Sequence, residues 1–252
     1  MGHALVTAGT SGLGRKVIEE FLKAGHSVTT TYFMNDKKAL KVKEQLSDYH
    51  DSLHIVQADV TKQADIEKLV EEARSIFGGI DYLINNAGPF IFERKKLLDY
   101  SNDEWHEMIQ GNLDAVFYLL KLTVPHMREQ RFGRIVNYGF QGANSSSGWV
   151  YRAAFAAAKS GLVSLTKSVA FEEAENQITS NMVCPGNIVG DMKESTIEKS
   201  RKVHDDTTPV GRPGTGEDIA RTILYLCDED SDMITGSVFE ITGGLDVINR
   251  HR

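Results

Sequence analysis

Short apolar runs of strand length alternate with longer amphipathic segments along almost the whole chain. The first run, 3–8, is followed by the segment 12–24, in which apolar side chains recur at helical spacing. Strand–helix alternation of this kind predicts a parallel sheet of about seven strands with helices on both faces, the doubly wound α/β class. The further strands are expected at 27–32, 53–59, 80–86, 133–139, 178–184 and 237–242, and the further helices at 36–49, 62–77, 102–130, 150–174 and 217–228.

Length, charge and cysteine content limit the classes of protein that fit. A chain of 252 residues without repeats or a Pro/Gly-rich linker predicts one domain over 1–252. A net charge of −7 and a pI near 5.6 argue against a general nucleic-acid binder. No apolar run is long enough to span a membrane, and the amino terminus lacks a basic start before an apolar stretch. Cys184 and Cys227 suit neither a disulfide framework nor a metal site. We therefore expect a cytoplasmic protein with no metal and no membrane or nucleic-acid partner.

A glycine-rich turn joins the first expected strand to the first expected helix. The stretch "VTAGTSGLGRKV" places Gly9, Gly12 and Gly14 in this turn, where the amides at the helix start can face an anion. Glycines are common in turns, so the cluster alone is weak evidence. Its position between a strand and a helix at the amino terminus favours a phosphate-binding turn.

This turn and the motifs after it resemble those of the short-chain dehydrogenase/reductase family over essentially the whole chain. The stretch "TAGTSGLG" (7–14) is similar to the family's T-G-x-x-x-G-x-G, although Ala8 replaces the first glycine. The other matching motifs, in order, are Asp59-Val60, "NNAG" at 85–88, Asn112 within a long helix, Lys159, "PG" at 185–186 and "TGG" at 242–244. The resemblance implies a single Rossmann-type domain that binds NAD(P), with a substrate lid at about 190–212. The closest type is the 3-oxoacyl-carrier-protein reductases.

The resemblance also implies where the cofactor lies. Asp59 and Val60 would border the adenine, and the residues of "NAG" would line the middle of the cofactor. The full set of implied cofactor-binding residues is Gly9, Ser11, Gly12, Leu13, Gly14, Tyr32, Asp59, Val60, Asn86, Ala87, Gly88, Lys159, Pro185, Gly186 and Ile188.

The end of the second strand bears on which nicotinamide coenzyme binds. In NAD enzymes an acidic residue there holds the ribose 2′-hydroxyl, and its charge repels a 2′-phosphate. Here Tyr32 and Phe33 stand at that place, and Asp36 follows, where we expect it to cap the next helix. Lys37 and Lys38 could approach a phosphate, although a solvated helix face explains each of them. The family's usual arginine for the 2′-phosphate is absent. NADP(H) is therefore favoured over NAD(H).

The residues expected around the nicotinamide have lost three hydroxyl groups. The family pairs a tyrosine, which protonates the reduced carbonyl, with a lysine four residues later that lowers the pKa of the tyrosine and holds the ribose. A serine orients the carbonyl, and an asparagine completes the set. Lys159 and Asn112 match, but Phe155 stands at the tyrosine position and Phe140 at the best match to the serine. Gly190 replaces a threonine that usually contacts the carboxamide.

Tyr151 is the candidate substitute for the lost acid. On the expected helix it would precede Phe155 by one turn, about 6 Å along the axis and about 40° around it. It would lie about 12 Å from Lys159, which is far for the usual pairing. The spacing is similar to that of enoyl-carrier-protein reductases, with seven intervening residues instead of six. An aromatic residue packed at the helix start is the plainer interpretation of Tyr151.

Two further sets of hydroxyl groups lie near the expected site. The serines at 145–147 follow Phe140 in a segment about two residues longer than the family's, and could fold back, although a polar loop is the plainer interpretation. Tyr138 would share a strand face with Phe140, because side chains alternate along a strand, and is expected in the core.

These observations lead to an NADP(H)-dependent oxidoreductase that reduces a 3-oxoacyl-type carbonyl or an activated alkene on a small-molecule or acyl substrate. Lys159 would hold the ribose, Asn112 would position Lys159 through water, and Tyr151 or solvent would supply the proton. A cofactor-binding pseudoenzyme, acting as a sensor or scaffold, is the alternative. A vestigial cofactor site, suggested by Ala8, is a third. The segment 236–252 resembles the family's last strand, which packs against another subunit, so a homodimer or homotetramer is expected.

Overall fold

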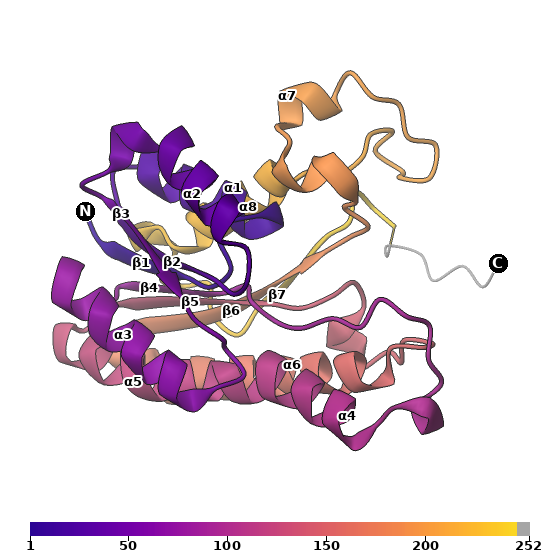
Figure 1. Cartoon of the computed structure of the whole chain (residues 1–252), viewed down its shortest axis with the longest axis horizontal. Coiled ribbons are helices and arrows are strands. Elements are labelled where there is room, and N and C mark those ends of the chain that lie inside the picture. Colours follow the sequence, from indigo (N-terminus) through magenta and orange to yellow (C-terminus); the bar gives the residue numbers. More distant parts are fainter. Residues whose placement is uncertain (246–252) are drawn as a thin grey trace.

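The computed structural model describes residues 1–245, and its centre is a parallel sheet of seven strands (Figure 1). The strand order is β3-β2-β1-β4-β5-β6-β7. The strands are β1 (His3–Val6), β2 (Ser27–Tyr32), β3 (Leu53–Gln57), β4 (Tyr82–Asn85), β5 (Gly133–Tyr138), β6 (Ile178–Pro185) and β7 (Val238–Ile241). The predicted doubly wound α/β class is confirmed.

The order of the strands reverses between β1 and β4. The chain begins at the centre with β1, moves outward through β2 and β3, and returns to β4 on the other side of β1. Val6 of β1 therefore lies between Thr30 of β2 and Ile84 of β4. The loops after β1 and β4 leave in opposite directions, and ligands of open α/β sheets bind in the crevice that this leaves.

Helices cover the sheet in two layers, with α1, α2 and α8 on one face and α3, α4, α5 and α6 on the other (Figure 1). The α-helices are α1 (Gly12–Lys23), α2 (Asp36–Gln45), α3 (Gln63–Phe77), α4 (Asn102–Ile109), α5 (Ala115–Gln130), α6 (Ala153–Glu172), α7 (Ile197–Ser200) and α8 (Gly216–Leu226). The shorter helical elements are η1 (Ser47–Tyr49), η2 (Leu97–Asp99), the π-helical turn η3 (Gln110–Asp114), η4 (Ala143–Ser145), η5 (Ala174–Asn176), η6 (Gly190–Glu194) and η7 (Glu229–Ser231). No helix within 1–245 is long and apolar enough to cross a membrane.

Each face of the sheet has its own apolar core. Ile18 and Ile223 belong to the core beneath α1 and α8, and Leu119 belongs to the core beneath α3, α5 and α6. Tyr138 lies in the first of these cores and Phe140 in the second. The predicted shared face of these two residues is therefore wrong, because β5 ends at Tyr138 and the chain leaves strand geometry before Phe140.

The expected helix over 102–130 is interrupted by the π-helical turn η3. This turn contains Asn112, whose Nδ2 donates to the carbonyl of Met108 at 3.0 Å and to that of Pro89 at 3.0 Å. A π-helical turn carries one extra residue and is frequent at functional sites. Here it accompanies a fully buried asparagine that binds the loop after β4.

The expected helix over 150–174 begins later than predicted, at Ala153. Tyr151 has φ of 65°, in the left-handed region, and Arg152 is the residue before the first helical turn. The left-handed backbone of Tyr151 cannot continue into a right-handed helix. The predicted position of Tyr151 on the same helix as Lys159 is therefore wrong.

The expected lid region, 190–212, contains η6, α7 and a loop that extends beyond the carboxyl ends of the strands (Figure 1). The expected subunit contact over 236–252 falls partly within β7. Its last seven residues, 246–252, lie outside the described part of the chain.

Candidate cofactor and active site

The glycine turn after β1 is held against β2 by two threonines. The amide of Ala8 donates to Thr31 Oγ1 at 2.8 Å, and the amide of Gly9 donates to Thr30 Oγ1 at 2.9 Å. Ala8 has φ of 56°, a conformation that glycine adopts without cost and alanine at roughly 1 kcal/mol. This backbone is the physical reason that a glycine suits the position, and Ala8 keeps it despite the strain.

The start of α1 approaches the turn so closely that Gly14 has no room for a side chain. A Cβ at Gly14 would lie 2.5 Å from the carbonyl oxygen of Ala8 and 2.6 Å from Asn86 Nδ2. Gly12 opens the helix with φ of 61°, and only Lys193 Cδ, at 3.9 Å, would be near its Cβ. The backbone amides at the start of α1 are therefore placed where a phosphate can approach them.

Asn86 connects the glycine turn to the loop after β4. Its Nδ2 donates to the carbonyls of Thr7 at 2.9 Å and Ala8 at 3.2 Å, and the amide of Ala87 donates to Thr7 Oγ1 at 2.8 Å. These bonds fix the two loops on either side of the point where the strand order reverses.

A cavity of about 590 Å³ brings together five of the predicted cofactor-binding residues. These residues are Tyr32, Asp59, Val60, Ala87 and Gly88. The carboxylate of Asp59 is oriented locally, because its Oδ1 accepts from the amide of Thr61 at 3.0 Å and from Thr61 Oγ1 at 2.7 Å. The cavity has the place and the size for an adenosine, and contact with one stays a prediction.

The carboxyl end of β2 presents a phenol where NAD enzymes present an acid. The pKa of Tyr32 is raised by desolvation and by the nearby carboxylate of Asp36. Asn35, not Asp36, caps α2, because Asn35 Oδ1 accepts from the amide of Lys38 at 2.9 Å. The predicted cap is therefore wrong. Lys37 and Lys38 are exposed at the start of α2.

A second pocket, of about 530 Å³, lies at the carboxyl end of β6. It is lined by the predicted cofactor residues Pro185, Gly186 and Ile188, together with Phe140. A Cβ at Gly186 would lie 3.0 Å from the Cα of Thr242, so only a glycine lets these two chain segments come so close. We call this the nicotinamide pocket, after the part of the cofactor that the resemblance assigns to these residues.

Aromatic rings fill the positions at which the family's serine and tyrosine are expected. Phe140 stacks on Trp149 with ring centroids 5.2 Å apart, and lies 6.0 Å from Phe155. Phe90 meets Phe155 edge to face at 5.0 Å. We call Phe90, Phe140, Trp149 and Phe155 the aromatic cluster. Neither Phe90 nor Trp149 is among the residues predicted from the sequence. The longer segment between Phe140 and Phe155 is a signal for Trp149, and no motif indicates Phe90.

Lys159 is a buried cation beneath this cluster. Its Nζ lies 5.7 Å from the centroid of the Phe155 ring and makes no hydrogen bond or ion pair with another residue of 1–245. Burial lowers the pKa of Lys159 to about 8, and the nearby Cys184 opposes the shift. An unpartnered buried ammonium is costly by itself, so the position suits a lysine that meets an acceptor when a ligand binds.

Asn112 offers a buried hydrogen-bond acceptor on η3, the π-helical turn that packs against α6. Both of its Nδ2 bonds go to backbone carbonyls, which leaves Oδ1 buried and without a partner in the described structure. A Cβ at Gly88 would lie 2.2 Å from this oxygen, so Asn112 and Gly88 are in direct contact. Buried polar atoms almost always have partners, and an orphaned one indicates a place for water or ligand.

Tyr151 lies outside the nicotinamide pocket lining. The Arg94 guanidinium lies 4.7 Å from the centroid of the Tyr151 ring, and the backbone carbonyl of Tyr151 accepts from Tyr100 Oη at 3.3 Å. Its role as proton donor stays a prediction, without the helical geometry that first suggested it. The serines at 145–147 are exposed in a loop, and among them Ser147 lines the nicotinamide pocket.

These features fit a nicotinamide dinucleotide. The close-packed glycine turn, the adenosine-sized cavity and the orphaned Asn112 Oδ1 lie along the carboxyl ends of the strands. When bound, such a cofactor supplies a hydride from C4 of its dihydronicotinamide ring.

Comparison with known proteins identifies the family. A family model described as enoyl-(acyl carrier protein) reductase matches residues 7–246. The chain is 36% identical over 242 residues to the 3-oxoacyl-[acyl-carrier-protein] reductase FabG of Haemophilus influenzae, covering 96% of this chain and 97% of the relative. The chain belongs to the short-chain dehydrogenase/reductase family.

Another relative and two solved structures are also similar over nearly the full length. The Bacillus subtilis (strain 168) protein YtkK, described as an oxidoreductase, is 57% identical and covers 100% of this chain and 99% of its own. A Bacillus thuringiensis structure described as a 3-oxoacyl-reductase is 62% identical, with a TM-score of 0.93 and coverage of 99% and 100%. A blue fluorescent protein from a metagenomic library, in complex with NADPH, is 27% identical, with a TM-score of 0.83 and coverage of 97% and 98%. The family is one of oxidoreductases that use a nicotinamide cofactor.

Proposed function

We propose that this protein is an NADP(H)-dependent reductase that delivers a hydride without the family's tyrosine acid. One observation carries the proposal: Lys159 and Asn112 are present and buried, while Phe155 and Phe140 fill the tyrosine and serine positions. The cofactor-holding side of the site is thus retained, and the proton-donating side is replaced by apolar rings.

In the proposed reaction, the bound cofactor would supply a hydride to an electrophilic carbon of the substrate. The π electrons of the reduced double bond move toward the substrate carbonyl oxygen. The Lys159 ammonium stabilises the negative charge on this oxygen, because electrostatic attraction is strong in the buried, weakly polar surroundings of the lysine. The proton comes from water or from Tyr151.

The aromatic cluster favours an activated alkene over an isolated ketone. Loss of general-acid catalysis typically costs 10²–10⁴-fold in rate. Hydride addition to an alkene conjugated with a carbonyl leaves an enolate, which is a weaker base than the alkoxide from a ketone and needs the acid less. Phe140 and Trp149 offer stacked rings against which a planar conjugated group can pack.

The coenzyme is proposed to be NADP(H). Tyr32 replaces the acid that would repel a 2′-phosphate, and Lys37 and Lys38 lie exposed at the start of α2. The NADPH complex of the similar blue fluorescent protein supports the same choice.

The proposed function is tested by comparing the rates at which the protein reduces two different hydride acceptors. With NADPH in excess, an α,β-unsaturated ketone should be reduced at least about tenfold faster than an acetoacetyl ester, because only reduction of the keto group of the ester passes through a strongly basic alkoxide. The rate of NADPH oxidation and the identity of the product are the measurements. Faster reduction of the acetoacetyl ester would contradict hydride transfer without the acid.

A cofactor-binding pseudoenzyme is the second candidate. The rings that fill the positions of Ser and Tyr favour it as well, since they remove catalytic groups and leave the cofactor side in place. Binding of NADPH without reduction of any acceptor would support this alternative. A vestigial cofactor site is the weakest of the three, because the glycine turn keeps its backbone conformation at Ala8.

We also propose that the chain acts as a homodimer or homotetramer in the cytoplasm. Phe117 of α5 and Phe171 of α6 are large apolar residues with 47% and 87% of their surface exposed. Exposed rings of this size on neighbouring helices are typical of a contact surface.

A further inference from the structure

The carboxylate of Glu194 is hydrogen-bonded to a backbone amide at the start of α1. The amide of Gly12 donates to Glu194 Oε1 at 2.7 Å. Gly12 is the first residue of α1, in the turn where the cofactor's pyrophosphate is expected. We propose that Glu194 is a latch that occupies the pyrophosphate position and must leave it when the cofactor binds. This inference rests on the proposed function, because it requires that NADP(H) binds at this turn.

The backbone around Glu194 is held in place as well as its carboxylate. A Cβ at Gly216 would lie 2.0 Å from the carbonyl oxygen of Lys193, so η6 runs in close contact with the start of α8. Met192 packs against the core beneath α1 and α8. Glu194 is therefore an exposed side chain at the end of a segment, η6, whose backbone packs against α1 and α8.

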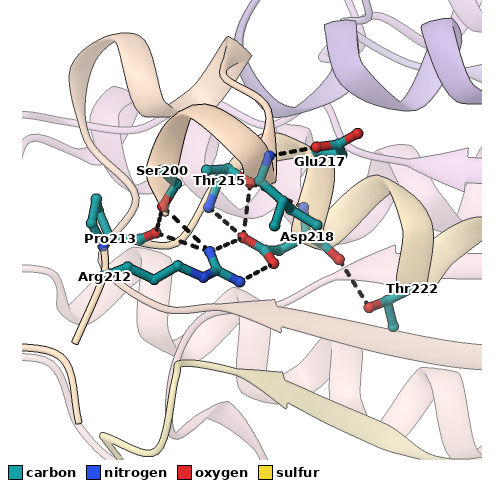
Figure 2. Close-up of polar contacts among 8 residues, drawn as sticks. Ser200, Arg212, Pro213, Thr215, Glu217, Asp218 and Thr222 are labelled. Carbon is teal, nitrogen blue, oxygen red and sulfur yellow. Dashed lines mark hydrogen bonds and ion pairs between the residues drawn. The ribbon is translucent and has the colours of Figure 1, made fainter. Parts of the chain in front are cut away.

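The rest of the lid is tied to α8, as Figure 2 shows. Arg212 Nη1 and Nη2 donate to the two carboxylate oxygens of Asp218 at 2.9 and 2.7 Å, and the amide of Ile197 donates to Glu217 Oε2 at 2.5 Å. Gly190, at the other end of η6, has φ of 53° and no atom within 4 Å of where its Cβ would be. The segment that carries Glu194 therefore lies between a glycine with open space around it and the part of the lid that is tied to α8.

Glu194 and a pyrophosphate cannot share the Gly12 amide. Both are acceptors with negative charge, and one N–H cannot satisfy the two at once without strong repulsion. The observed affinity for the cofactor is then the intrinsic affinity reduced by the fraction of molecules that are unlatched. Cofactor binding and displacement of the Glu194 carboxylate are thereby coupled.

The test is a calorimetric titration of NADPH into the wild type, Glu194→Gln and Glu198→Gln. Glu194→Gln keeps the shape of the side chain and removes its charge. Its Kd for NADPH should fall by about three- to tenfold, because a neutral amide oxygen accepts from the Gly12 amide more weakly than a carboxylate does. Glu198→Gln is the matched control, because Glu198 lies in the same lid but pairs with Lys202 at 3.0 Å. Its Kd should equal that of the wild type.

A second variant tests the latch by way of the backbone. Gly190→Ala should also tighten NADPH binding, because alanine disfavours the left-handed conformation from which η6 begins. Equal Kd values for the wild type and both variants would overturn the latch and leave the proposed cofactor site intact. Absence of NADPH binding in all of them would overturn the proposed function and the latch together.

Discussion

Replacing Phe140 by serine and Phe155 by tyrosine should raise kcat/KM for an acetoacetyl ester by about 10²–10⁴-fold, the usual contribution of a general acid. Residue 155 lies on α6 one helical turn before Lys159, and the Phe155 ring already lies 5.7 Å from the Lys159 Nζ. A tyrosine there would have its phenol beside a buried cation. The cation would lower the pKa of that phenol from about 10 and prepare it to exchange a proton near neutrality. The gain should appear in the rate of acetoacetyl ester reduction with NADPH.

Two controls show whether the gain comes from this pair of groups. Phe140→Ser alone should give no gain, because it restores the group that orients the carbonyl without an acid. Adding Lys159→Met to the double variant should abolish the gain. A double variant that binds NADPH like the wild type yet gains nothing would contradict the account. Trp149, which stacks on Phe140, would then be the first residue to replace.

Lys159→Met should stabilise the cofactor-free protein by about 3 kcal/mol at pH 7, from the 1.36 kcal/mol that each pKa unit represents. Burial lowers the pKa of Lys159 from 10.5 to about 8. Between these values the unfolded chain holds a proton that the folded chain has released. The unfolding free energy of the wild type should therefore rise with pH from about 8 to 10.5 and be lowest below pH 8. Methionine removes the buried charge and this rise.

Urea titrations of both proteins at pH 7 and pH 10 measure this effect. The same variant should bind NADPH at least about tenfold more weakly, because it lacks the ammonium that we propose holds the cofactor ribose. Stability and cofactor affinity thus change in opposite directions, which a merely structural lysine would not produce. Lower stability of Lys159→Met without cofactor would contradict the assignment of an unpartnered buried cation.

Most of the fold could be predicted from the sequence, because buried parallel strands are short apolar runs and amphipathic helices have a distinct period. Two helices, over about 102–130 and about 150–174, form where they are predicted but differ in detail, and they show the limit of this reasoning. Apolar spacing does not register the one extra residue of a π-helical turn at 110–114. It also does not register the left-handed backbone of Tyr151, which delays the start of α6 to Ala153.

The candidate site was predictable where it depends on local motifs, and not where it depends on distant contacts. The glycine turn and Lys159 each follow from a short motif. The contact between Gly12 and Glu194 joins residues 182 positions apart, and no local pattern relates them. The stacking of Trp149 on Phe140 likewise depends on the path of an intervening loop.

The central claim is that this chain keeps a working cofactor site although the hydroxyl groups around the nicotinamide are lost. Calorimetric titration of the wild-type protein with NADPH and with NADH tests it most directly. The account predicts saturable binding of one NADPH per chain, tighter than the binding of NADH. Absence of binding by either coenzyme would contradict it.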